Sequence, residues 1–124
     1  MGNPFVYVEL HSSDVAKART FYGDLLDWDF QTMAMPVGDY TVIGVGDGTG
    51  GGMMAQREPN GPSRWLPYIG VDDVAVAAAK ARTLGAAVVQ EKTEVPDMGW
   101  FAVITDPTGA TVALWQAKSQ TAHT

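Results

Sequence analysis

Residues 8–15 read VELHSSDV, an extended run that turns into a helix start. Side chains alternate along a strand, so Leu10 lies on one face and Glu9 and His11 lie on the other. The Ser-Ser-Asp that follows offers a helix N-cap, because such side-chain oxygens accept hydrogen bonds from the first backbone N–H groups of a helix. Apolar residues then recur at helical spacing. The stretch therefore predicts a strand followed by an amphipathic helix over about 14–26.

The same transition returns in the second half of the chain, where residues 68–74 read YIGVDDV and Gly85 is expected to end the helix. The tripeptide DVA recurs at a spacing of 59 residues, and so does a turn that reads DGTG first and DPTG later. Around each copy the pattern reads strand, helix and three strands. We therefore predict an α+β fold in a single domain over 1–124, made of two βαβββ modules at about 5–56 and 65–116 with a linker at 57–64.

The composition limits the class of protein and its partners. The chain has 124 residues, 46% apolar and 18% charged, which is typical of a globular protein. Its net charge of −6 disfavours nucleic acid and anionic membranes as partners. The absence of Cys excludes disulfides and Cys-ligated metals, and the two His, His11 and His123, are too few for a three-His site. No signal peptide or membrane span is expected, so we predict a cytoplasmic protein.

Several segments together resemble the vicinal oxygen chelate superfamily, which includes glyoxalase I, bleomycin-resistance proteins and extradiol dioxygenases. The resemblance covers about residues 5–116 and rests on 8–15, on Phe21-Tyr22-Gly23 with Trp28, on 68–74, and on 106–109 with Leu114-Trp115. It implies a single-domain member whose two modules form a mixed sheet curled around a shared cavity. The same scaffold carries many activities, so the resemblance is more specific for fold than for function.

The resemblance also implies where a metal would be held. In the family's metalloenzymes four ligands, usually His and Glu, stand on the first and last strands of the two modules. Here these positions fall on Tyr7, Leu66, Ala113 and on Gly52 or Met53. Leu and Ala carry no donor atom, and a neutral Tyr is a poor ligand. We therefore expect no metal and no other cofactor, which disfavours glyoxalase I and dioxygenase chemistry, because both need a metal.

Strand alternation predicts which side chains line the cavity. Glu9 is central: among aromatic side chains, desolvation would raise the pKa of its carboxyl, which makes it a candidate general acid or base with Tyr68 as the second catalytic residue. The alternative is a structural Glu9 that only holds hydrogen bonds within the sheet. His11 either forms a metal-binding or proton-relaying pair with Glu9 or lies solvated at the rim. The predicted ligand-binding residues are Tyr7, His11, Met53, Leu66, Trp100, Ala113 and Trp115.

The predicted function is metal-independent binding of a small apolar or aromatic metabolite, as in glyoxalase and bleomycin-resistance proteins. Two alternatives stay open. One is an isomerase, epimerase, cyclase or lyase that uses Glu9 as general acid or base. The other is a divalent-metal lyase or dioxygenase of the same superfamily, with Glu9 and His11 among its ligands. The resemblance also implies a homodimer, and the number of large aromatic residues, more than one small core readily encloses, favours it.

Overall fold

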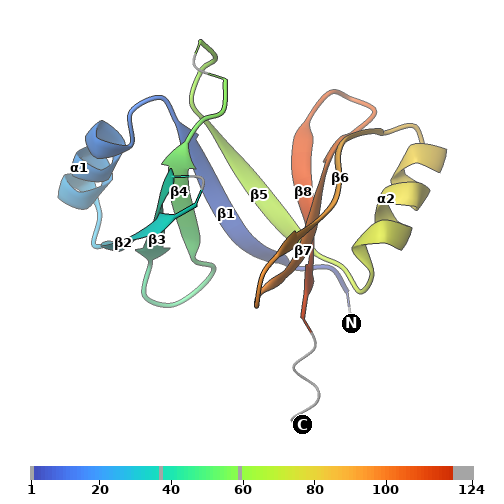
Figure 1. The fold of residues 1–124 in the computed structure, drawn as a ribbon, viewed down its shortest axis with the longest axis horizontal. Coiled ribbons are helices and arrows are strands. Elements are labelled where there is room, and N and C mark those ends of the chain that lie inside the picture. Colours follow the sequence, from blue (N-terminus) through green and yellow to red (C-terminus); the bar gives the residue numbers. More distant parts are fainter. Residues whose placement is uncertain (1, 37, 59, 119–124) are drawn as a thin grey trace, which may run out of the picture. The chain divides into compact units, whose positions relative to one another are not determined.

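The computed structural model describes residues 2–36, 38–58 and 60–118 (Figure 1). The order strand, helix, three strands occurs twice, so the predicted α+β fold of two βαβββ modules is confirmed. The chain forms two compact units: the first unit comprises residues 7–66, and the second unit comprises the residues before 7 and after 66. The elements are β1 (Phe5–Ser12), α1 (Val15–Leu25), β2 (Asp29–Met35), β3 (Gly38–Gly44), β4 (Gly51–Ala55), β5 (Arg64–Gly70), α2 (Val74–Thr83), β6 (Ala87–Val95), β7 (Gly99–Thr105) and β8 (Thr111–Ala117).

In the first unit the strands lie in the order β2-β3-β4-β1, with β1 parallel to β4 and the other neighbours antiparallel. Its buried core consists of Leu10, Ile43 and Met53, against which apolar side chains of α1 pack. The Asp14 carboxylate accepts a hydrogen bond from the backbone N–H of Lys17 at 3.0 Å, which confirms the predicted cap. The parallel pairing with β4 fixes the face that each β1 side chain presents.

The second unit repeats this plan with the strand order β5-β8-β7-β6 and with β5 parallel to β8. Asp73 caps α2 by accepting from the backbone N–H groups of Ala75 and Val76. Gly85 follows the helix at φ +102°, a left-handed conformation in which a residue with a Cβ is strained, so the predicted helix end is also confirmed. The core of this unit consists of Val74, Ala78, Ala102, Ile104 and Leu114.

Two features named from the sequence fall partly or wholly outside the described residues. The predicted linker contains residue 59, and His123 lies beyond residue 118. Among the residues that the structure describes, no helix has the length and apolar character needed to cross a membrane.

The turn between β7 and β8 is closed by a single carboxylate. Asp106 accepts hydrogen bonds from the Thr108 hydroxyl at 2.7 Å, from the Thr108 N–H at 2.8 Å and from the Ala110 N–H at 3.0 Å. The Thr108 hydroxyl, followed by the backbone N–H groups, lowers the pKa of Asp106 below its usual value. Side-chain oxygens of Asp commonly organise such turns.

This turn should make a small, pH-dependent contribution to stability. Because the pKa of Asp106 is lowered in the folded state, its contribution is complete above the unfolded pKa and is lost as pH falls through the folded-state pKa. We expect the wild type to exceed Asp106→Asn in free energy of unfolding at neutral pH and the difference to shrink in acid. Urea unfolding between about pH 6 and pH 2 measures this difference. A difference independent of pH would show that the charge of Asp106 does not stabilise the turn.

Candidate functional site

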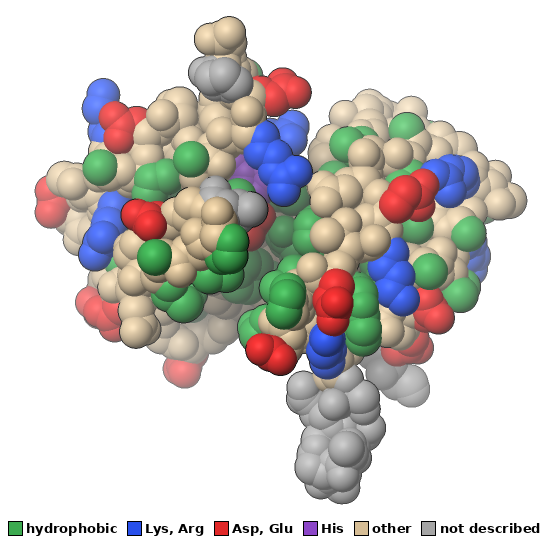
Figure 2. Space-filling view, in the orientation of Figure 1, with side chains coloured by type: hydrophobic (Ala, Val, Ile, Leu, Met, Phe, Trp, Pro, Cys, Tyr) green, Lys and Arg blue, Asp and Glu red, His purple; other side chains and the backbone are tan. Residues whose placement is uncertain are grey.

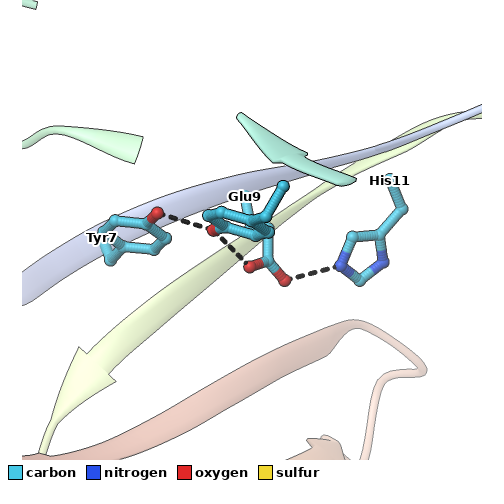
Figure 3. Close-up of polar contacts among 4 residues, drawn as sticks. Tyr7, Glu9 and His11 are labelled. Atoms are coloured by element: carbon cyan, nitrogen blue, oxygen red, sulfur yellow. Dashed lines mark hydrogen bonds and ion pairs between the residues drawn. The ribbon is translucent and has the colours of Figure 1, made fainter. Parts of the chain in front are cut away.

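A buried carboxylate stands at the centre of the first unit's polar cluster. Glu9 is only 8% exposed. Its Oε2 accepts a hydrogen bond from the Tyr40 hydroxyl at 2.7 Å, and its Oε1 lies 2.8 Å from Nε2 of His11 (Figure 3). The Tyr7 and Tyr40 hydroxyl oxygens are 2.6 Å apart. We call these four residues, Tyr7, Glu9, His11 and Tyr40, the Glu9 cluster.

Strand alternation brings three members of the Glu9 cluster together. Tyr7, Glu9 and His11 are alternate residues of β1, so their side chains leave the strand on one face, as Figure 3 shows. The sequence predicted this shared face. It left open whether His11 pairs with Glu9 or is solvated at the rim, and the structure shows the pair, with the His11 side chain 21% exposed. Side chains of its own strand and of β3 therefore both hold the Glu9 carboxylate.

Tyr40 was not among the predicted site residues. It lies on β3, and β4 separates β3 from β1 in the sheet. The register pairs Glu9 with Gly52 of β4, and Gly52 in turn with Val42 of β3. Tyr40, two residues before Val42, lies on the same face and reaches across β4 to the carboxylate. The sequence signal for this contact across β4 was Gly52, because a glycine inside a strand often marks a place where other groups approach closely.

Gly52 makes room for both tyrosine hydroxyls. A Cβ built on Gly52 would overlap the hydroxyl oxygens of Tyr40 and Tyr7, far inside van der Waals contact. Gly52 is itself buried and its φ is not in the left-handed region, so the requirement for glycine is steric and not conformational. The Glu9 cluster therefore requires a residue without a side chain at position 52 of β4.

The protons of the Glu9 cluster have a definite direction when Glu9 is ionised. Tyr40 has one hydroxyl proton and gives it to Glu9, so the short contact between the tyrosines requires Tyr7 to donate to Tyr40. Burial, reinforced by the charge of Glu9, raises the pKa of Tyr40 far above its usual value. Burial is also the main reason that the pKa of Tyr7 is raised. Both phenols therefore stay protonated near neutral pH and serve as hydrogen-bond donors.

Met53 and Leu66 were both predicted to line the cavity, and the structure contradicts the predicted position of Met53. Met53 is fully buried against Leu10 and Ile43 on the α1 side of the sheet, so its predicted place on the face of Glu9 is wrong. The register explains this: Gly52 is paired with Glu9, and the next residue must point to the other face. Leu66 is 3% exposed, on β5. Its role as a ligand-binding residue stays a prediction.

The remaining predicted residues belong to the second unit. The Tyr68 ring lies 6.3 Å from both the Phe101 and the Trp115 rings, and Ala113 is fully buried beside Tyr68 in the β5–β8 register. These residues form an aromatic cluster on one face of the second unit. The joint catalytic role of Tyr68 with Glu9, and the ligand-binding roles of Ala113 and Trp115, stay predictions.

Trp100 was expected among the ligand-binding side chains and is placed elsewhere. It packs against the core beneath α2, while the next residue, Phe101, contacts Tyr68. Alternation along β7 therefore puts Trp100 on the face opposite to the aromatic cluster. The ammonium groups of Lys92 and Lys118 lie 5.0 Å and 5.2 Å from its ring centroid. Its role as a ligand-binding residue stays a prediction, from a face that Tyr68 does not share.

The residues present do not fit the metal site that the superfamily implies. Of the implied ligand positions, Leu66 and Ala113 offer only hydrocarbon, and Gly52 offers no side chain. The space beside Gly52 is filled by the Tyr7 and Tyr40 hydroxyls, which are committed to the hydrogen bonds of the Glu9 cluster. Within the described ranges no group of three or more His, Cys, Asp and Glu side chains comes together. A divalent metal normally takes more protein ligands than Glu9 and His11 supply.

Comparison with known proteins identifies the protein family to which a chain with this fold and this site belongs. The model of the glyoxalase-like domain matches residues 7–115. The chain therefore belongs to the glyoxalase-like domain family, within the vicinal oxygen chelate superfamily.

Known relatives and structures agree with this assignment. The chain is 33% identical over 93% of its length to "Putative glyoxylase CFP32" of Mycobacterium tuberculosis, covering 44% of that protein. It is 29% identical over 89% of its length to the anthracycline biosynthesis protein DnrV of Streptomyces peucetius, covering 46% of that protein. The chain thus spans about half the length of the curated relatives it matches. The methylmalonyl-CoA epimerase structure from Mycobacterium tuberculosis shares its fold, with a TM-score of 0.70 at 15% identity over 97% of this chain and 91% of that one.

Proposed function

We propose that this protein binds a small apolar or aromatic metabolite without a metal and that the Glu9 cluster orients it. The observation that carries the proposal is the buried Glu9 carboxylate, held by Tyr40 and His11 at 2.7 Å and 2.8 Å. A buried charge is costly unless it is paired and hydrogen-bonded. Side chains from two strands offset this cost by hydrogen bonding to the carboxylate, and Gly52 leaves room for them. Pairing of the strands into a sheet does not require such an arrangement.

The chemistry of the Glu9 cluster indicates what part of a ligand it would hold. The hydroxyl protons of Tyr7 and Tyr40 point along the chain of hydrogen bonds toward Glu9. The oxygens of the cluster therefore suit a ligand that brings its own donors, such as a hydroxyl or an ammonium group. A net charge of −6 favours a cationic ligand over an anionic one.

Relatives support an aromatic ligand. DnrV, and a second relative of the same description at 28% identity, are named for anthracycline biosynthesis. Anthracyclines combine a flat aromatic system with hydroxyl groups and an amine, the features that the Glu9 cluster and the charge of this chain would recognise. We therefore use an anthracycline as the probe ligand.

We also propose that the protein is cytoplasmic, because a chain without cysteine fits a reducing compartment.

A second candidate function is a metal-independent proton-transfer enzyme, such as an isomerase, epimerase, cyclase or lyase. The contact between Glu9 Oε1 and His11 Nε2 favours it, because it gives the carboxylate a titratable neighbour that is 21% exposed. In such a reaction Glu9 would accept a proton from the substrate and return it at another position. His11 and Tyr40 would hold the carboxylate in one orientation while the proton moves.

Metal independence and ligand binding are tested together. We expect calorimetric titration of the purified protein with an anthracycline to give the same affinity before and after treatment with a chelator. Elemental analysis should find well under one equivalent of zinc, nickel, iron or manganese, and the chelator should leave the melting temperature unchanged. A stoichiometric metal that survives dialysis and stabilises the fold would overturn the metal-free proposal. Failure to bind anthracyclines or related polycyclic phenols and amines would overturn the aromatic ligand class.

A further inference from the structure

The first unit contains a cavity on the face of its sheet opposite to the Glu9 cluster. The volume of this cavity is about 270 Å³. Val8 lines it, and alternation along β1 places Val8 on the other face from Tyr7 and Glu9. Ile43 also lines it and belongs to the buried core on the α1 side of the sheet. The residues that line the cavity include no member of the Glu9 cluster.

One wall of the cavity is a row of three paired residues without a side chain in the middle. Gly51 of β4 is paired with Val8 of β1 on one side and with Ile43 of β3 on the other. A Cβ built on Gly51 would overlap the Val8 carbonyl oxygen, so position 51 excludes a side chain. The two consecutive glycines therefore act on opposite faces. Gly52 leaves room for the Glu9 cluster, and Gly51 leaves this wall of the cavity bare.

Two tryptophans form the aromatic walls, and we call this space the Trp28–Trp65 cavity. The two ring centroids are 6.4 Å apart, and the ring planes meet at 79°. The Tyr22 ring stacks on Trp28 at 5.5 Å and meets the Trp65 ring edge-on at 5.6 Å. These contacts hold both indoles in place, so the walls are formed before a ligand binds. Trp65 is 38% exposed, which gives a ligand access from solvent.

The lining of the Trp28–Trp65 cavity carries no charge. Figure 2 shows acidic and basic side chains spread over the visible face of the first unit. None of the described residues that line the cavity is charged, and its polar side-chain groups are the Thr49 hydroxyl and the two indole N–H groups. A charged ligand would lose its hydration here without gaining an ionic partner. An apolar cavity of this kind favours a neutral apolar ligand.

The size of the cavity limits the ligand to one or two rings. A dry apolar cavity of about 150 Å³ holds benzene, and pockets for drug-sized ligands measure about 300–1,000 Å³. The Trp28–Trp65 cavity lies between these sizes. Its nearly perpendicular indoles offer a ring face and a ring edge, the two contacts that aromatic groups prefer. We propose that the Trp28–Trp65 cavity is a second ligand site, which binds a neutral aromatic molecule of one or two rings.

Toluene and benzoate are matched probes for this site, because they are similar in size and differ in charge. We expect toluene to raise the melting temperature and to shift the NMR signals of the Trp28 and Trp65 indole N–H groups saturably below its solubility limit. Benzoate should shift neither signal. The indole signals of Trp100 and Trp115, which do not line the cavity, should stay unchanged with both probes. No saturable shift with toluene, or equal affinity for benzoate, would overturn the proposal.

Variants of the lining test whether toluene occupies the Trp28–Trp65 cavity. Val45 lines the cavity, so Val45→Phe should fill it and lower the affinity for toluene about tenfold or more. Val89→Phe, at an exposed valine of β6, is the matched control and should leave the affinity unchanged. Trp65→Ala removes a partly exposed wall and should also weaken binding. Circular dichroism checks that each variant is folded, and undiminished affinity in a folded Val45→Phe or Trp65→Ala protein would contradict the proposal.

Glu9→Gln separates this second site from the function proposed above. Because Glu9 lies on the opposite face of the sheet, its substitution should leave the affinity for toluene unchanged. A lower affinity for toluene in Glu9→Gln would place toluene at the Glu9 cluster and refute the second site. Failure of an anthracycline to bind would overturn its ligand class at the Glu9 cluster and would not alter the result with toluene. The two proposals can therefore fail separately.

Discussion

Glu9→Gln should weaken binding of an anthracycline by about 1–3 kcal/mol, or roughly 5- to 150-fold in dissociation constant. The substitution keeps the shape of the side chain and removes its charge. The Gln oxygen can still accept from Tyr40, and its amide can donate to Nε2 of His11 in the other tautomer of the imidazole. The fold should therefore persist, and the loss should appear in affinity. Calorimetric titration of the wild type and the variant measures it.

The same variant distinguishes binding from catalysis once a reaction is known. If Glu9 is a general acid or base, turnover should fall by about 10²- to 10⁴-fold while substrate binding persists. Glu58→Gln, which changes an exposed glutamate of the same unit, is the matched control and should alter neither quantity. Unchanged affinity and activity together with a changed melting temperature would show that Glu9 is structural. The site assignment would then fail, although the fold assignment would stand.

Gly52→Ala should disrupt the Glu9 cluster although none of its four residues is substituted. The new methyl group would overlap the Tyr40 and Tyr7 hydroxyls, and the rings would have to swing away. The hydrogen bond from Tyr40 to the Glu9 carboxylate would then be lost, at a cost of about 1.5–3 kcal/mol for a bond to a charged group. Anthracycline affinity should fall with it. Denaturant unfolding and calorimetric titration give the two numbers.

Tyrosine spectroscopy and a control substitution at a second glycine test whether Gly52→Ala acts by displacing Tyr40. Displacing Tyr40 from its buried place beside Glu9 should lower its pKa toward the ordinary value for a phenol, which ultraviolet titration of tyrosine ionisation detects. Gly44→Ala on β3, where a Cβ makes an ordinary 3.6 Å contact with Asp29, should have little effect. Adding Tyr40→Phe to Gly52→Ala should cost less than the sum of the two single changes, because the overlapping hydroxyl is already gone. Additive losses would mean that Gly52 acts on the fold by some other route.

The local signals in the sequence were sufficient for the architecture. Asp14 and Asp73 cap their helices and Gly85 ends the second one, as predicted, because caps depend on hydrogen bonds within a few residues of chain. The order strand, helix and three strands can be read twice along the sequence, and this repeat predicted the two modules. The shared face of Glu9 and His11 also followed from local geometry, since alternate residues of one strand share a face, whereas the sequence left their pairing open.

The sequence by itself thus determined the elements, their order and the face of β1 that carries Tyr7, Glu9 and His11. The tertiary structure decided how neighbouring strands are aligned, and with this the partners of that face. A shift of one residue in register exchanges the two faces of a strand, and no local signal fixed it for β4 or β7. Met53 therefore lies on the helix-covered face of its unit, opposite to the prediction, and Trp100, whose face the sequence left open, lies on the helix-covered face of the other unit. The same alignment set Gly52 beside Glu9 and let Tyr40 cross β4 to reach the carboxylate, a contact between residues 31 positions apart that strand periodicity cannot foresee.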